Sequence, residues 1–370
     1  MKTKVIKIAE TPITEAAQIA AEAIQAGKLV GFPTETVYGI AVDATNFEAV
    51  ARLRELKSRP TAPFSVHVAT ASDASRYIKN MPNRASWLMD RAWPGPATLL
   101  VQTGGEFADP QLNAIEGLWE SLTLDGVLGL RCPDEVFTQY MLSLAGVPVI
   151  APSANLQGEP SPKCADDVLT RLDGKIDLLI DTGKTKYGQD SSIVKFDGAD
   201  WTIIRQGVFN TAMLQRMMTR KIAFVCTGNT CRSPMAEGIA KRILAARLNC
   251  PVADLAKNGV EIISAGAMAC DGDPATHEAV VAAANLGADI ANHKSQRLTP
   301  MLTKTCDLIF CMTDSHRAMA QAMADGVPPV VTLLDNNGIP DPFGGDLEIY
   351  NATAKAIEDA IIKNVQDGKL

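Results

Sequence analysis

The sequence is poor in long apolar runs, in excess positive charge and in aromatic side chains. No apolar stretch reaches the roughly 18–20 residues that a helix needs to span a bilayer. No charged-then-apolar leader stands at the N-terminus. The net charge is −7, and residues 221–370 carry 13 basic and 17 acidic side chains, so neither half is a polycation suited to tight non-specific binding of DNA or RNA. We therefore expect a cytoplasmic protein with no membrane partner.

Paired cysteine motifs are also missing. The eight cysteines are scattered, with no CxxC pair and no Cys/His spacing typical of zinc. This pattern argues against a metal centre or a disulfide framework and favours reduced thiols. At 370 residues the chain is too long for one typical core. We predict two domains, residues 1–212 and 220–370.

The most informative stretch is IAFVCTGNTCRSP, residues 222–234. Cys226 follows an apolar strand-like run, and Arg232 comes six positions later, just before a helix. Backbone N–H groups of such a loop converge on one anion, and the positive end of the helix adds to them. Arg232 can hold two phosphate oxygens through its planar guanidinium, and the same field favours the thiolate of Cys226. The alternative is a buried structural cysteine with a solvated arginine, but the strand, loop and helix in register favour a phosphate loop.

The loop has residues suited to a tight turn and a helix start. Gly228 allows unusual φ values, and Asn229 tolerates the left-handed region and can tie the loop internally. Ser233 is expected to cap the helix, with Pro234 at its first position. Cys231 lies in the same loop and could form a reversible disulfide with Cys226, although a buried thiol is an equally good interpretation.

Strands and helices alternate through the second half, which predicts an α/β domain with a central parallel sheet and helices on both faces. In such a sheet Cys226 lies at the carboxyl edge of the first strand, where open sheets bind ligands. Further along, we expect helices at residues 235–246, 274–286 (with Asp273 as N-cap), 313–324 and 347–365, and strands at 260–264, 305–312 and 330–333.

Asp341 begins the string DPFGG and is the candidate acid for a leaving group. The proline holds the loop, the glycines let it approach a ligand, and the carboxyl can give a proton to the departing atom. An isolated Asp-Pro pair is more often an ordinary turn. Beside Cys226 and Arg232 we favour the catalytic interpretation.

The second half resembles the low-molecular-weight protein-tyrosine phosphatase family, through VCTGNTCRSPMAE, SAG (264–266), CMT (311–313) and DPFGG. The resemblance implies that Cys226 attacks phosphorus without a cofactor, that Arg232 neutralises charge, and that Asp341 protonates the leaving group and then activates water against the phosphocysteine. It implies that Ser233 donates to the thiolate. The remaining residues of the loop would surround the phosphate: Thr227, Gly228, Asn229, Thr230 and Cys231.

Two questions on this half stay open. Thr230 is small and hydroxylated where tyrosine-specific members usually carry a bulkier aliphatic residue, and the strings are most similar to the protein-arginine phosphatase branch. We favour a phosphoarginine protein substrate over phosphotyrosine, but one residue seldom decides a pocket's preference. Arsenate reductases share this loop and use extra redox cysteines; Cys306 and Cys311 could act so, but their apolar strand favours buried packing.

In the first half, several short strands with few crossover helices predict an α+β domain with a twisted mixed sheet. Its loops suit anions: PTETVYG (33–39) follows a strand, KSRP (57–60) carries two cations, and PSAN (152–155) is small and polar. KSRP suits a triphosphate, but a solvated helix end is an equal alternative. His67 lies in an apolar run and is more often a core residue than a ligand. The segment 104–126 is expected to be a mobile excursion.

Nine motifs in one order resemble the YrdC-like threonylcarbamoyl-AMP synthase family: PTETVYG, KSRP, VHV, WPGP, LGLRCP, APSAN, GEPSP, DSSIV and IIRQG. The resemblance implies that L-threonine, bicarbonate and ATP give threonylcarbamoyl-AMP and pyrophosphate, with Mg²⁺ accompanying ATP. The product would pass to the tRNA-modification transferase machinery, and so indirectly to tRNA. The implied ATP contacts are Lys57, Arg59, Ser153, Asn155, Ser161 and Arg205, and the implied threonine contacts are Thr36, His67, Arg131 and Ser191.

These resemblances predict a bifunctional enzyme in which a synthase is fused to a cysteine phosphatase. The alternative is that the first half only binds a nucleotide or RNA and regulates the phosphatase, since proteins of one fold need not share one reaction.

Overall fold

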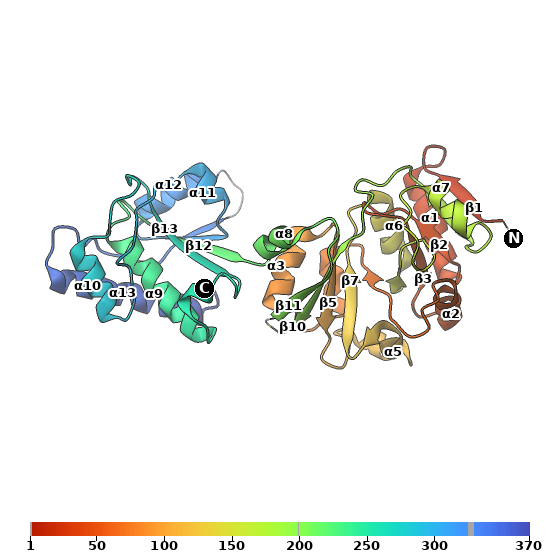
Figure 1. The fold of residues 1–370 in the computed structure, drawn as a ribbon, viewed down its shortest axis with the longest axis horizontal. Coiled ribbons are helices and arrows are strands. Elements are labelled where there is room, and N and C mark those ends of the chain that lie inside the picture. The colour runs from red at the N-terminus through yellow and green to blue at the C-terminus, as the bar shows by residue number, and fades with distance from the viewer. Residues whose placement is uncertain (1, 199, 325–328) are drawn as a thin grey trace. The chain divides into compact units, whose positions relative to one another are not determined.

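The computed structural model describes residues 2–198, 200–324 and 329–370. It divides into two compact units, Met1–Met218 and Thr219–Leu370 (Figure 1). In the part of the chain so described, no helix is long and apolar enough to cross a membrane.

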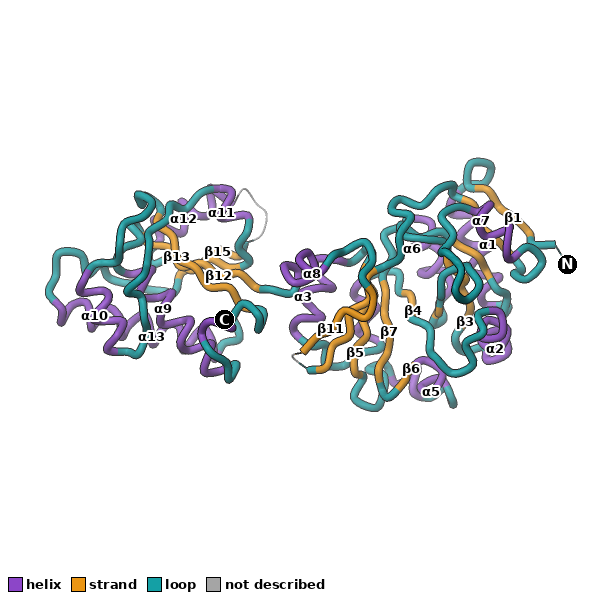
Figure 2. Tube along the Cα trace, in the orientation of Figure 1, coloured by secondary structure: helices purple, strands orange, loops and turns teal. Residues whose placement is uncertain are grey.

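The first unit is built on one mixed sheet, whose strands are orange in Figure 2. The sheet contains parallel pairs such as β1·β9 and antiparallel pairs such as β5·β7, as the sequence predicts for an α+β domain. Within the described residues the strands lie in the order β1 (Lys4–Lys7), β9 (Leu178–Asp181), β2 (Val30–Phe32), β3 (Gly39–Asp43), β8 (Val149–Ile150), β4 (Val66–His67), β7 (Val127–Arg131), β5 (Ala97–Gln102), β10 (Ser192–Asp197) and β11 (Asp200–Arg205), with β6 (Thr123–Leu124) beside β7.

The helices of this unit pack on the sheet through small buried side chains, and some have a side-chain cap at their N-terminus. Helix α1 (Ile13–Gln25) is rich in alanine, and its small buried side chains share one core with α6 (Val136–Ala145). Helix α2 (Phe47–Leu56) begins at Asn46, whose side chain accepts the N–H of Ala49. The other longer helices are α3 (Asn83–Ala92), α7 (Ala165–Leu172) and α8 (Thr211–Met217).

The expectation of a mobile excursion at residues 104–126 is wrong. The segment contains the short helices α4 (Pro110–Asn113) and α5 (Leu118–Leu122) and strand β6. Its apolar side chains anchor it to the core, because Phe107, Leu112, Leu118 and Leu122 are all buried.

The second unit confirms the predicted parallel sheet with helices on both faces (Figure 1). The order is β13 (Val260–Gly266), β12 (Arg220–Cys226), β14 (Leu308–Cys311), β15 (Val330–Leu333), and all three pairings are parallel. Alternate side chains of β12 face two cores: Phe224 packs with the helices on one face, and Val225 packs with those on the other. The helices are α9 (Arg232–Arg247), α10 (His277–Asn285) and α13 (Leu347–Gln366) on the first face, and α11 (Pro300–Lys304) and α12 (Asp314–Ala324) on the second.

Two predicted helix starts are corrected. Helix α10 begins at His277 with Thr276 as N-cap, not at residue 274 with Asp273 as cap; the Thr276 side chain accepts the N–H of Ala279. Helix α9 begins at Arg232, so Ser233 lies inside its first turn and does not cap it. The hydroxyl of Ser233 turns instead to the thiol of Cys226.

Candidate active sites in the two units

The loop from β12 to α9 places Cys226 at the carboxyl edge of the parallel sheet. Cys226 is 3% exposed, and its Sγ lies 3.0 Å from the Ser233 hydroxyl and accepts the N–H of Asn229 at 3.3 Å. Asn229 takes the left-handed conformation with φ 57°, whereas Gly228, expected to need unusual φ values, is not among the residues with positive φ. The sharp bend of the loop is therefore made at Asn229.

A chain of hydrogen bonds fixes which way the donors around Cys226 point. Asn229 Oδ1 accepts the N–H of Gln296 at 2.8 Å, so its Nδ2 group donates to Ser233 (2.9 Å) and Ser264 (2.8 Å). Ser264 in turn donates to Glu237 at 2.6 Å. The Ser233 oxygen thus receives a hydrogen from Asn229, and its own hydrogen can go to the Cys226 sulfur at 3.0 Å or to the Ala265 carbonyl at 3.3 Å.

Arg232 connects the loop to the candidate acid. It is 4% exposed, its Nη1 donates to the Ile339 carbonyl at 3.3 Å, and its Nη2 pairs with Asp341 Oδ2 at 2.5 Å. Its Nε is buried and has no hydrogen-bond partner among the described residues. A buried donor without a partner is costly, so this edge of the guanidinium suits an anionic ligand. The Asp341 side chain is 50% exposed and also accepts the N–H of Phe343 at 3.3 Å.

A cleft of about 620 Å³ adjoins these groups and brings in a residue that sequence reasoning missed. His316 is 5% exposed; its Nε2 lies 2.9 Å from Thr227 Oγ1 and its Nδ1 lies 2.8 Å from Thr313 Oγ1. Its position five residues after Cys311 gave a weak signal, a histidine in the first turn of a helix that follows a strand. The cleft is lined by Thr227, Arg232, Thr313, Asp314, Ser315, His316, Asn337, Gly338, Ile339, Pro340 and Asp341.

Two buried thiols of this unit, Cys306 and Cys311, suit packing better than a redox relay. All eight cysteines of the chain are free, and Cys231 Sγ lies 3.3 Å from the hydroxyl of Tyr350. Burial raises the pKa of Cys306 to about 11 and that of Cys311 to about 12. Packing is therefore the better interpretation of Cys306 and Cys311.

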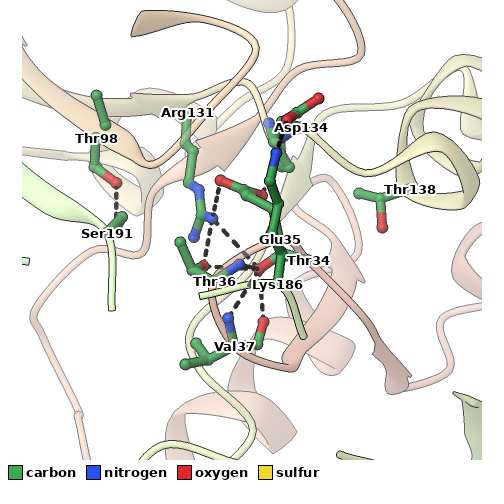
Figure 3. A network of polar contacts seen from close by, with 12 residues as sticks. Thr34, Glu35, Thr36, Val37, Thr98, Arg131, Asp134, Thr138, Lys186 and Ser191 are labelled. Atoms are coloured by element: carbon green, nitrogen blue, oxygen red, sulfur yellow. Dashed lines mark hydrogen bonds and ion pairs between the residues drawn. The ribbon is translucent and has the colours of Figure 1, made fainter. Parts of the chain in front are cut away.

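In the first unit, strand register gathers three side chains into one row across the sheet. Arg131 on β7 pairs with His67 on β4 and with Thr98 on β5, so the three lie side by side. Ser191 joins the row, because its hydroxyl lies 2.9 Å from that of Thr98 (Figure 3). Thr98 was not found from the sequence, since only the pairing of β5 with β7 brings it there.

Arg131 is held by the loop of the PTETVYG motif. Its Nη2 donates to Thr36 Oγ1 at 2.6 Å and pairs with Glu35 Oε1 at 3.0 Å, and Glu35 Oε2 accepts the N–H of Asp134 (Figure 3). The Arg131 and Glu35 side chains are only 7% and 1% exposed. The Nε of Arg131 is buried and unpartnered within the described residues, as in Arg232. Glu35 is the third residue, after His316 and Thr98, that sequence reasoning missed.

His67 is neutral at ordinary pH. Burial lowers its pKa to about 3, the charge of Arg131 adds to this shift, and the carbonyl of Ser65 opposes it. A neutral imidazole beside Arg131 offers one donor or acceptor without repelling the guanidinium.

The residues predicted for ATP fall into two groups, with Arg59 apart. Lys57 Nζ donates to the Ser153 carbonyl at 2.9 Å and to both oxygens of Asn155. Burial lowers the pKa of Lys57 to about 8; the charge of Arg59 adds to this shift, and that of Asp190 opposes it. Arg59 is exposed, with its guanidinium 5.3 Å from the centre of the Phe64 ring.

Asp190 organises the second group. It accepts the Ser161 hydroxyl at 2.9 Å and lies 3.9 Å from Arg205. Arg205 also donates to the carbonyl and the hydroxyl of Ser191, which ties this group to the row that contains Arg131. This second group of predicted nucleotide contacts thus adjoins the predicted threonine contacts.

The two folds and their sites define two classes: a mixed-sheet domain with a buried arginine in a row of hydroxyl side chains, and a parallel-sheet domain whose β12–α9 loop brings a cysteine and an arginine together. Family models match both. Residues 22–207 match the Sua5, YciO and YrdC model, described as telomere recombination, and residues 221–367 match the low molecular weight phosphotyrosine protein phosphatase model. The chain belongs to both families, as a fusion of the two.

Individual relatives support this division. The chain is 36% identical over 199 residues to threonylcarbamoyl-AMP synthase of Bacillus subtilis, covering 52% of this chain and 55% of the relative. The synthase of Pyrococcus abyssi is 36% identical over 193 residues, with 51% and 53% covered. The chain thus spans about half the length of these curated relatives. The protein-arginine-phosphatase of Bacillus subtilis is 36% identical over 146 residues, covering 38% of this chain and 91% of that protein.

Solved structures agree on the first fold. A double variant of Sua5 from P. abyssi aligns with a TM-score of 0.52 and 25% identity, covering 71% of this chain and 91% of that one. P. abyssi Sua5 complexed with L-threonine aligns with a TM-score of 0.51 and 22% identity, covering 72% and 92%, which shows the shared fold.

Proposed function

We propose that the chain is a bifunctional enzyme. The first unit joins L-threonine, bicarbonate and ATP into threonylcarbamoyl-AMP, and the second unit removes phosphate from phosphorylated proteins. One observation supports both halves: each unit holds a buried arginine whose Nε has no partner among the described residues, at the place where the proposed substrate brings an anion.

In the synthase unit, Arg131 would hold the carboxylate of threonine. Beside Arg131 lie the hydroxyls of Thr36, Thr98 and Ser191, which can accept hydrogen bonds from the threonine ammonium group or orient the substrate hydroxyl. Neutral His67 completes the row. P. abyssi Sua5 has been seen with L-threonine, which supports this choice of ligand.

The nucleotide would lie along Lys57, Ser153, Asn155, Ser161 and Arg205. Lys57 is engaged with the Ser153–Asn155 loop, so it would shape this loop and add positive charge near the phosphates. The reaction is adenylyl transfer, in which the carbamate oxygen of N-carboxythreonine displaces pyrophosphate from the α-phosphorus. Catalysis is then positioning and charge stabilisation with no covalent nucleophile. Mg²⁺ would be carried by the ATP phosphates; Asp190, which accepts the Ser161 hydroxyl, is a carboxylate beside the proposed nucleotide contacts.

In the phosphatase unit, the Cys226 thiolate would attack phosphorus while the bond to the leaving group breaks. Asp341 gives its proton to the departing nitrogen or oxygen, and Arg232 neutralises the transferring phosphoryl group. Water then attacks the phosphocysteine, Asp341 takes a proton from it, and phosphate leaves as thiolate returns. Ser233 stabilises that thiolate with the hydrogen that the Asn229 network leaves free.

Phosphoarginine is the favoured substrate. The cleft beside Arg232 and Asp341 is lined by hydroxyl, carboxyl and amide groups, and its described lining contains no phenyl, phenol or indole ring. A guanidinium can hydrogen-bond to such walls, whereas a phenol ring gains most from aromatic neighbours. Phosphotyrosine stays the second candidate, because Phe343 is 77% exposed beside Asp341 and can stack on a ring.

The substrate test compares phosphoarginine and phosphotyrosine peptides on wild type and on Thr230→Ile. We expect wild type to prefer phosphoarginine in kcat/KM, and the substitution to move the preference toward phosphotyrosine by about tenfold or more. A wild-type preference for phosphotyrosine that Thr230→Ile leaves unchanged would reverse the assignment.

The synthase test is exchange of labelled pyrophosphate into ATP. We expect exchange that needs both threonine and bicarbonate, because both must be present before adenylyl transfer. If the first unit binds ATP but supports no exchange, it is the nucleotide-binding regulatory module that the sequence left open. Thiol-coupled turnover of arsenate that depends on Cys306 or Cys311 would instead favour a reductase, which their burial argues against.

A further inference from the structure

His316 joins the first residue of the phosphate loop to the start of α12. Its two ring nitrogens are both engaged, Nε2 with Thr227 Oγ1 at 2.9 Å and Nδ1 with Thr313 Oγ1 at 2.8 Å. Thr313 precedes α12, and its hydroxyl also lies 2.9 Å from that of Ser315. One buried side chain thus bridges two strand ends, that of β12 and that of β14.

Thr227 is held from two sides. Its carbonyl accepts the N–H of Met268, just after β13, at 2.9 Å, and its side chain meets His316 from the α12 side. Thr227 follows Cys226 directly, so these two contacts set the direction in which the ring of loop amides begins. Amides that already point at the anion stabilise it without reorganising during the reaction.

A neutral imidazole fits this place. Burial lowers the pKa of His316, the positive charge of Arg232 adds to the shift, and Asp341 opposes it. A neutral ring has one N–H and one bare nitrogen, and two hydroxyls can satisfy either tautomer. His316 therefore acts through hydrogen bonds and not as a further cation for the phosphate.

We propose that His316 is a positioning residue for the phosphate loop, acting through its Nε2 contact with Thr227. This role rests on the phosphatase function proposed above. It predicts that loss of the contact weakens binding of the phosphate dianion and slows attack by Cys226, whichever leaving group the substrate carries.

Two substitutions separate the two ring contacts. His316→Gln places an amide where Nε2 lies and keeps a partner for Thr227, while His316→Asn places one where Nδ1 lies and keeps the partner of Thr313. We expect His316→Gln to stay within about threefold of wild type in kcat/KM, and His316→Asn to lose about tenfold or more, because the exposed Thr227 side chain then loses the buried imidazole that fixes its direction. If His316 serves only to anchor α12, the order of the two variants is reversed or equal, and the proposal is overturned.

The substrates are p-nitrophenyl phosphate and a phosphoarginine peptide, and equal fractional losses on both are expected. Thr227→Val should cost about as much as His316→Asn, and the double variant should cost no more than either, since all three remove one contact. Independent, multiplying losses would contradict the link. Melting temperatures of the variants report any general damage to the fold.

Binding of inorganic phosphate separates the proposed role of His316 from the proposed phosphatase function. Its dissociation constant, measured by titration calorimetry, should rise about tenfold in His316→Asn and stay near wild type in His316→Gln. This ranking needs no turnover. If the three proteins bind phosphate in this order but wild type hydrolyses neither substrate, the phosphatase assignment fails while the role of His316 stands. If wild type and both variants bind phosphate equally, the role of His316 is lost.

Discussion

The two arginines that are buried among the described residues pair with carboxylates that differ in their exposure to solvent. Arg131 and Arg232 each pair one terminal nitrogen with a carboxylate and each have a buried Nε without a partner among the described residues. Glu35, the partner of Arg131, is 1% exposed and holds a backbone N–H with its second oxygen. Asp341, the partner of Arg232, is 50% exposed on a loop. An enclosed carboxylate can only fix its arginine, whereas one that reaches solvent can exchange a proton and approach a substrate.

The largest effect should come from removing the guanidinium of the phosphate loop. Arg232→Ala is expected to lower phosphatase kcat by about 10³–10⁵-fold, the range for an arginine that stabilises a transferring phosphoryl group. Arg232→Lys should recover little, because the ammonium lacks the planar fork. Steady-state kinetics on p-nitrophenyl phosphate checks this, and a loss of less than tenfold in Arg232→Ala would remove Arg232 from the mechanism.

A smaller effect is expected at the other arginine. Arg131→Lys keeps the charge but loses the fork that a carboxylate prefers, so KM for threonine should rise by roughly tenfold to a hundredfold. KM for ATP should change much less, because the proposed nucleotide contacts, such as Lys57 and Ser161, are separate side chains. Pyrophosphate exchange at varied threonine measures both, and an equal rise in the two KM values would argue that Arg131 holds no threonine carboxylate.

The two acids should separate stability from activity. Glu35→Ala leaves a buried arginine uncompensated and should lower the free energy of unfolding of the first unit by about 3–5 kcal/mol. Asp341→Ala removes a half-exposed partner and should cost the second unit at most about 1 kcal/mol, while phosphatase kcat falls by roughly 10²–10⁴-fold. Denaturant unfolding with paired kinetics tests both; Glu35→Gln is the matched control that keeps size and one acceptor. A loss of several kcal/mol in the free energy of unfolding of Asp341→Ala would show that the Asp341–Arg232 pair contributes to stability as the Glu35–Arg131 pair does.

Near neutral pH the smallest effect on stability is that of His67, which develops only as the pH falls. Its folded pKa, about 3, lies below the ordinary value of 6.5, so between these pH values the unfolded chain binds a proton that the folded chain does not. Stability therefore falls as pH drops below 6.5, at most by about 1.4 kcal/mol per pH unit from this group. His67→Gln should flatten the acid side of the stability curve of the first unit. An unchanged curve would show that His67 is not held neutral.

The phosphate loop could be predicted because its parts are adjacent in sequence. Cys226, Arg232 and the strand and helix around them lie within thirteen residues, so local pattern was enough. Thr98 and His316 could not be found in this way, because each reaches its site through tertiary pairing: Thr98 through the register of β5 on β7, and His316 through the pairing of β12 with β14. Glu35 stands next to Thr36 in the PTETVYG motif, but its role depends on the ion pair with Arg131, which lies 96 residues away in the sequence.

The errors in the fold also have local causes. Asp273 and Thr276 both suit an N-cap, and Pro274 between them did not decide which one starts α10. Residues 104–126 read as mobile because glycines and acids dominate the string, yet Phe107, Leu112, Leu118 and Leu122 are spaced so that they reach the core. The composition of this segment reflects its exposed residues and does not show that a few apolar side chains anchor it to the core.

The most direct test of two independent arginine sites is to measure both activities on each arginine variant of the full chain. Arg131→Lys should weaken pyrophosphate exchange at threonine concentrations below KM and keep phosphatase turnover near wild type, and Arg232→Lys should lose phosphatase turnover and keep the exchange. If either substitution removes both activities, or if neither activity responds to its own arginine, the account of two separate anion sites is contradicted.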